Sequence, residues 1–225
     1  MPYIVCAEEV ERHWVAYAPD LPGCYATHKE REAAIGAVPA AVEAYITWCL
    51  GHGLLVSGLT GPMVVDEVVR SWPYEDDYEV NAFFASDRPA LIIDELPEIK
   101  LLLAATRKDM LATVDNLEPE DLMKELPGER WPIAGILGHA ASAEWWYLDR
   151  MGLAFPQSQI PEDPFARLAS VREHFVTCLP ALAKRTGVVT LSGESWSPRK
   201  VLRRALWHER DHTEHILKLR AKLGR

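Results

Sequence analysis

The stretch that decides the fold is Trp207-His208-Glu209-Arg210-Asp211-His212, within a segment that has no glycine or proline from Val201 to Leu223. Residues four apart lie on one face of a helix, so His208 and His212 stack one turn apart. Their face also carries apolar residues at helical spacing, namely Val201, Ala205, Ile216 and Leu219. Two imidazoles on a core-facing stripe need polar partners, because an unsatisfied buried polar group is costly. A single metal ion would be a partner for both rings.

A third histidine, His139, falls on the inward face of another predicted helix, together with Ile136, Ala143 and Tyr147. Any one of the three histidines alone is better interpreted as a core residue with an ordinary hydrogen-bond partner. Three of them on the inward faces of two helices favour a metal site, because helical bundles build such sites from facing helices. Three nitrogens with an open fourth position are typical of catalytic rather than structural zinc.

His215 lies three residues after His212 on nearly the same face, and three roles stay open for it: a fourth ligand, a group that orients the ligands, or a surface residue. Nearby carboxylates could orient the rings or handle protons. These carboxylates are Glu144, Glu209, Asp211 and Glu214. For each of them a solvated helix surface is the favoured interpretation.

A basic run and several tryptophans surround the histidines. The basic residues are Arg199, Lys200, Arg203 and Arg204, and the tryptophans are Trp131, Trp145, Trp146, Trp196 and Trp207. A solvated face is the favoured interpretation of the basic run, and the alternative is an anionic substrate or partner near the mouth of a bundle. Aromatic walls are typical of small-molecule pockets and of bundle cores alike.

The first part of the chain has the chemistry of strands. Short apolar stretches rich in aromatic and β-branched residues predict strands at 3–7, 13–18, 24–27, 63–69 and 78–85. Residues 30–49 predict a helix that Pro39 bends. The order β-β-β-α-β favours a small α+β unit with a helix on one face of a sheet.

The second part is helical. Residues 97–116, 132–150, 164–184 and 197–223 predict four helices, several of which begin with proline near the first position. Four helices of this length favour a bundle. The sequence therefore predicts two domains, an α+β domain at 1–88 and an all-α four-helix bundle at 89–225.

Composition limits the function classes. The chain has 225 residues, of which 48% are hydrophobic and 25% charged, as expected for an ordinary globular protein. The absence of a long apolar run excludes a membrane span, and the N-terminus does not resemble a signal peptide, so a cytoplasmic location is expected. The four cysteines show no C-x-x-C spacing and are interpreted as reduced, mostly buried thiols.

Charge is unevenly distributed. Residues 1–90 contain 14 acidic and 5 basic residues, whereas residues 91–225 contain 19 of each, so the first part carries the whole net charge of −9. Binding to nucleic acid needs lysine and arginine to contact phosphates. We therefore expect the first part to bind a basic partner or none, and no nucleic acid.

Residues 91–225 resemble the DinB-like superfamily. The resemblance is carried by Trp131-Pro132-Ile133 before His139, by Trp196-Ser197-Pro198 at the start of the last helix, and by the segment from His208 to Ile216. It implies a four-helix bundle with a three-histidine metal site, in which His139, His208 and His212 are the ligands. Where many relatives carry another polar residue, this chain has His215. Characterised relatives include transferases and isomerases that use low-molecular-weight thiols.

Residues 1–85 resemble the HicB-type antitoxin fold. Tyr17-Ala18-Pro19-Asp20-Leu21-Pro22-Gly23-Cys24 matches the family's strand-turn-strand segment, and residues 30–49 match its helix. The DNA-binding tail that the family usually has is missing here, and the helical part takes its place. Exposed strand edges make a protein partner or a homodimer the candidate assembly.

Two functions are compatible with these observations. The first is a metal-dependent enzyme, a thiol-dependent transferase or a hydrolase, that uses zinc or nickel on a small-molecule substrate with a low-molecular-weight thiol. The second is a non-enzymatic regulatory or interaction protein related to toxin–antitoxin systems, in which the histidines serve stability alone.

Overall fold

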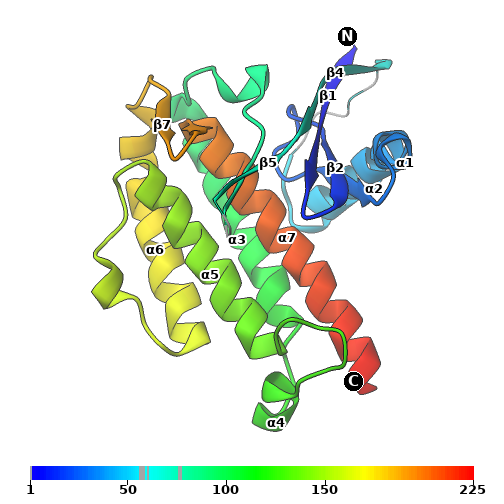
Figure 1. Cartoon of the computed structure of the whole chain (residues 1–225), viewed down its shortest axis with the longest axis vertical. Coiled ribbons are helices and arrows are strands. Elements are labelled where there is room, and N and C mark those ends of the chain that lie inside the picture. The colour runs from blue at the N-terminus through cyan, green and yellow to red at the C-terminus, as the bar shows by residue number, and fades with distance from the viewer. Residues whose placement is uncertain (1, 56–58, 60, 76–77) are drawn as a thin grey trace. The chain divides into compact units, whose positions relative to one another are not determined.

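The computed structural model describes residues 2–55, 59, 61–75 and 78–225. The chain forms two compact units, Met1–Ala90 with Thr186–Arg203 and Leu91–Arg185 with Arg204–Arg225. A mixed-sheet region is thus followed by a helical region (Figure 1). In the part of the chain that is described, no helix combines the length and the apolar character that crossing a membrane requires.

The sheet of the first unit has four strands in the order β3-β2-β1-β4. They are β1 (Tyr3–Val10), β2 (His13–Tyr17), β3 (Tyr25–His28) and β4 (Met63–Arg70). Neighbours pair antiparallel except β1 and β4, which are parallel. Glu11 and Arg12 alone form the turn between β1 and β2, at φ of 48° and 66°. Such two-residue turns match the twist of a hairpin. The strands predicted at 3–7 and 13–18 are both present, and the first of them continues to Val10.

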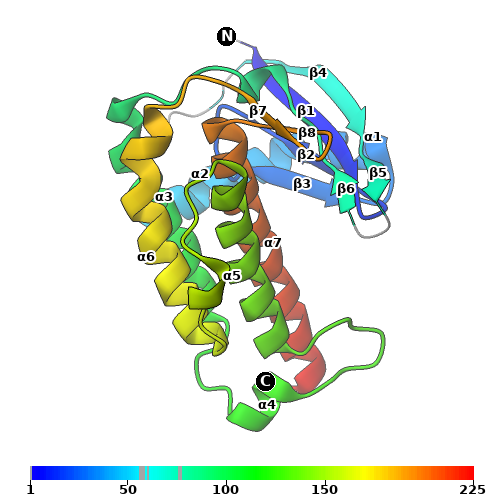
Figure 2. The same cartoon turned by 60° about the vertical axis from the view of Figure 1, so that its left-hand side comes forward.

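Two helices, α1 (Arg31–Gly36) and α2 (Val38–Gly51), pack against this sheet (Figure 2). The prediction of one helix bent at Pro39 was wrong in detail, because the helix is interrupted at Ala37. Pro39 lies in the first turn of α2, where a missing amide proton costs nothing. The two helices lie between β3 and β4 in the chain, and they are part of the connection after which β4 pairs parallel to β1.

The predicted strand at 78–85 is much shorter. Strand β6 (Tyr78–Val80) pairs with β5 (Trp72–Glu75) in a separate hairpin and ends there. Beyond it, the carboxylates of Glu8 and Asp87 accept the backbone amides of Ala82 and Phe84. These amides donate to side chains and are therefore not available for pairing with another strand, so the strand ends at Val80. A second separate hairpin, β7 (Val189–Leu191) with β8 (Glu194–Trp196), was not predicted.

The four predicted long helices are all present. They are α3 (Leu96–Ala112), α5 (Ile133–Arg150), α6 (Pro164–Ala183) and α7 (Pro198–Leu223), and a short α4 (Pro119–Met123) lies between the first two. The four long helices run side by side (Figures 1 and 2). One apolar cluster joins them, with Met110 from α3, Ile136 and Leu137 from α5, Leu168 from α6 and Ile216 from α7.

Candidate metal centre

Helices α5 and α7 bring three predicted histidines together. His139 comes from the second turn of α5, and His208 and His212 lie one turn apart on α7. A ring nitrogen of each lies within 4.8 Å of the others, and the Nε2 atoms of His208 and His212 are 3.0 Å apart. The His139 ring centre lies 5.0 Å from that of His208 and 5.1 Å from that of His212. The spacing of inward-facing residues on two helices therefore predicted this cluster.

The imidazoles of His208 and His212 are neutral at physiological pH. Burial, followed by the charges of His212 and His139, lowers the pKa of His208 well below its usual value of 6.5. Burial and the charge of His139 lower the pKa of His212 to about 3. A neutral imidazole offers a lone pair, which is the form that binds a metal.

The cluster fits a cation. The Nδ1 atom of His212 is buried and has no hydrogen-bond partner among the residues that the structure describes, while its Nε2 faces another imidazole. Buried polar atoms left in this way are costly. Zinc bound tetrahedrally at about 2.0–2.1 Å from nitrogen holds its ligand atoms about 3.3–3.4 Å apart. The His208–His212 nitrogen spacing of 3.0 Å is close to that value, and the other nitrogens lie within 4.8 Å, so ring movements would complete such a site.

Aromatic side chains border the histidines. Trp131 stacks on His139 with ring centres 4.6 Å apart and planes at 27°. Trp207 and Tyr147 present ring edges to His208, at 5.8 Å and 6.2 Å. Of the five tryptophans that surround the histidines in the sequence, Trp131 and Trp207 thus contact the cluster.

His215 does not join the cluster. Its ring centre lies 6.2 Å from that of His212, and its Nε2 contacts the carboxylate of Glu129 at 2.9 Å. Glu129 also accepts a hydrogen bond from Lys222. His215 therefore lies outside the set of three clustered histidines, and the geometry gives no support to the role of fourth ligand.

Two of the nearby carboxylates are buried, which corrects the expectation of a solvated surface. Glu144 on α5 binds Arg107 at 2.8 Å and Arg172 at 2.5 Å. Glu209 on α7 binds the same two arginines, at 2.5 Å and 2.6 Å, and also accepts the hydroxyl of Thr106. The two glutamates and two arginines therefore link α3, α5, α6 and α7 around the core. Glu214 is exposed, as expected.

The predicted solvated basic run is also wrong for most of its members. Lys200, Arg203 and Arg204 are buried. In the first unit, Lys200 binds Glu194 at 2.5 Å, and Arg203 binds Asp87 at 2.9 Å and Glu8 at 3.2 Å. These pairs satisfy charges inside the unit, so they do not form a surface for an anionic partner.

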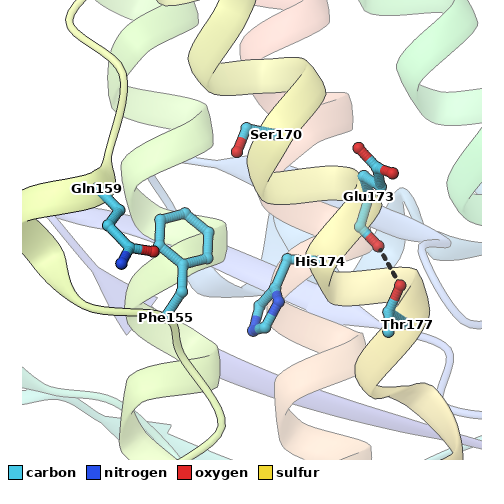
Figure 3. A pocket seen from close by; sticks show the side chains of 6 residues that line it. All are labelled: Phe155, Gln159, Ser170, Glu173, His174 and Thr177. Carbon is cyan, nitrogen blue, oxygen red and sulfur yellow. Dashed lines mark hydrogen bonds between the residues drawn. The ribbon is translucent and has the colours of Figure 1, made fainter.

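A hollow of about 340 Å³ lies between α6 and the segment that carries Phe155 and Gln159 (Figure 3). Its lining consists of Phe155, Gln159, Ser170, Glu173, His174 and Thr177. The Nε2 atom of His174 contacts the carbonyl oxygen of Leu153 at 2.7 Å, and the Phe155 ring stands on edge to the imidazole. None of the three clustered histidines lines this hollow, so it is separate from the candidate metal centre.

A second group of ligand-type atoms lies in the first unit. Cys6 on β1 lies within 4.8 Å of carboxylate oxygens of Asp66 and Glu67, at a bulge between β1 and β4. Burial, with a contribution from Glu67, raises the pKa of Cys6 to about 12. Glu67 accepts the backbone amide of Ala85 at 2.6 Å. Cys6 is therefore a protonated thiol and presents no thiolate to a metal ion. The neutral imidazoles of His208 and His212, in contrast, present lone pairs.

Comparison with known families gives a match, which lies in the helical part of the chain. The family model described as the DinB superfamily matches residues 102–216, about half of the chain. The matched range contains His139, His208 and His212. Neither the curated proteins nor the solved structures gave a match.

Proposed function

Because the chain belongs to the DinB superfamily, we propose that its helical unit is a DinB-type four-helix bundle and works as a metal-dependent enzyme. The proposed ligands are His139, His208 and His212, and the proposed metal is zinc or nickel, both of which suit imidazole. The observation that carries the proposal is the convergence of the three ring nitrogens within 4.8 Å. A bound metal of this kind polarises a substrate oxygen or lowers the pKa of a bound thiol or water.

The residues of the chain prepare the site in three ways. The imidazoles of His208 and His212 are neutral, so their lone pairs are available without loss of a proton. Trp131 and Trp207 pack against the rings of His139 and His208. The charges of Glu144 and Glu209 are offset by two arginines, so neither carboxylate competes for a cation.

These features suit a small-molecule substrate that reacts with a low-molecular-weight thiol. A thiolate is an anion with a soft donor atom, and zinc binds such ligands readily. An aromatic wall accommodates the apolar part of a substrate. We therefore propose a thiol-dependent transferase, with a hydrolase that uses water in place of the thiol as the second reaction class.

For residues 1–88 we propose a HicB-like module that contacts a protein or a second copy of the chain and binds no DNA. The hairpin β1–β2 followed by β3 and the helix pair supports this proposal. The surplus of acidic residues in this part of the sequence supports it too. We also propose a cytoplasmic location.

Metal content tests the proposal directly. Purified protein, reconstituted with zinc or nickel and passed through a desalting column, should retain about one metal ion per chain by mass spectrometry. The double variant His208→Ala/His212→Ala should retain none, whereas His174→Ala, at the hollow on α6, should match wild type. Wild-type protein that retains no divalent metal would overturn the proposal. If the metal is retained, assays of low-molecular-weight thiols with small electrophiles would identify the reaction.

A further inference from the structure

The loop at residues 124–132 joins α4 to α5 and is fastened to α7. Glu129, in this loop, contacts His215 Nε2 at 2.9 Å and accepts a hydrogen bond from Lys222. Its side chain is 16% exposed, so this contact is better protected than a fully solvated ion pair. The loop is thus held to the helix that carries two of the three clustered histidines.

Two residues after Glu129, the same loop contacts His139, the third histidine of the cluster, through Trp131. The indole of Trp131 stacks on the imidazole of His139, and the guanidinium of Arg130 lies 4.3 Å from the centre of the Trp131 ring on its face. His139 is the only member of the cluster from α5, whereas His208 and His212 are neighbours on one helix. The orientation of the His139 ring therefore depends on what lies against it.

The first turn of α5 is shaped for this contact. A Cβ atom at Gly135 would lie 2.9 Å from Cβ of Trp131, which is too close. Glycine inside a helix normally costs stability relative to alanine. At Gly135 this cost is offset by the close approach that lets Trp131 reach His139.

We propose that Glu129, His215 and Trp131 form a clasp, in which the Glu129–His215 contact holds the loop so that Trp131 fixes the ring of His139 and slows metal exchange. This inference rests on the proposed function of the histidine cluster. It assigns His215 the role of a positioning residue outside the ligand set. Groups that orient a ligating histidine affect metal affinity by about 10- to 100-fold when they are removed.

A matched pair of glycine variants tests the clasp. Gly135→Ala should displace Trp131 and speed zinc loss to a chromogenic chelator by about 10-fold or more. Gly138→Ala, in the same helix, adds a Cβ that meets its nearest atom at an ordinary 3.6 Å and should leave the rate unchanged. Trp131→Ala should match Gly135→Ala, and Trp131→Phe should restore most of the slow exchange. Equal rates in Gly135→Ala, Trp131→Ala and wild type would overturn the proposal.

Replacement of Glu129 is expected to change the rate of zinc loss less than replacement of Trp131. Glu129→Ala should speed zinc loss by up to about fivefold, which corresponds to a partly exposed ion pair. Lys222→Met removes the other partner of Glu129 and leaves the contact with His215, so it should have less effect. A larger effect of Lys222→Met than of Glu129→Ala would contradict the assignment to His215.

A second measurement keeps the clasp testable apart from the metal. In metal-free protein with isotope-labelled histidine, stacking on an indole should shift the ring protons of His139 upfield. This shift should persist in Gly138→Ala and be lost in Gly135→Ala. Wild-type protein that shows the shift but binds no metal would refute the proposed function, and with it the effect on metal exchange, and would support only the contact of Trp131 with His139. Protein that binds metal without the shift would refute the clasp alone.

Discussion

Replacement of Glu209 by glutamine should destabilise the helical unit strongly. The Glu209 side chain is only 4% exposed and accepts hydrogen bonds from Arg107 at 2.5 Å, from Arg172 at 2.6 Å and from Thr106. Glutamine keeps the volume and removes the charge. Two buried guanidinium groups would then share the single remaining carboxylate, that of Glu144.

The size of the effect follows from the burial of the partners. Breaking a buried ion pair by removal of one partner costs about 3–5 kcal/mol, mainly because the other charge is left uncompensated. That is a large part of the roughly 5–15 kcal/mol by which native proteins are stable. For a chain of this length, about 2–4 °C is lost per kcal/mol, so Tm should fall by about 6–20 °C.

Chemical denaturation followed by helical circular dichroism would measure this change. Glu214→Gln is the matched control, because Glu214 lies on the same helix and is exposed, so its replacement should change stability by about 0.5 kcal/mol or less. A further variant, Glu209→Gln combined with Arg172→Met, should recover part of the loss, because one uncompensated charge is removed. A loss below about 1 kcal/mol for Glu209→Gln would refute the assignment of the network as a buried, charge-balanced link.

Three further results are expected. A chelator should lower the Tm of wild type and leave that of His208→Ala unchanged, because metal that binds only the folded protein stabilises it; equal shifts in both would contradict a metal at this site. Metal-free protein should lose stability as the pH falls from about 6.5 towards 3, because the folded-state pKa of His212 is lowered to about 3 and the unfolded chain takes up the proton first. The loss is about 1.4 kcal/mol per pH unit, and denaturation of His212→Gln should show a slope smaller by that amount. Arg203→Met should cost about 3–5 kcal/mol in a denaturation experiment, because two buried carboxylates lose their cation, and an unchanged midpoint would show that these charges are solvated.

The helices and the histidine cluster could be predicted because both depend on local spacing. His208 and His212 share a face wherever α7 forms, since four residues make about one turn. The inward direction of His139 followed from its apolar neighbours at helical intervals. The expectation that the two faces meet needed only helices packed around one core, which the apolar cluster of the structure provides.

The buried charges could not be predicted because they depend on partners distant in the sequence. Glu144 and Arg172 each occupy a helix position that a charge usually takes only on a solvated face. Their contact joins α5 to α6, and no spacing rule connects the two positions. The same holds for Arg203 and Glu8, which are 195 residues apart. An isolated charged residue in a helical pattern therefore gave no signal that it was buried.

The structure also assigns a role to a motif that a sequence alone leaves ambiguous. His208-Glu209-Arg210-Asp211-His212 has the His-Glu-x-x-His spacing that in metalloproteases provides two zinc ligands and a general-base glutamate. A general base must reach the proton that it removes and must have a pKa near the working pH. Burial by itself would raise the pKa of Glu209, but Arg172 and Arg107 outweigh this effect and lower it. Successive residues on a helix point about 100° apart, and here the carboxylate faces two arginines. Glu209 therefore acts in packing and is not placed to act as a general base.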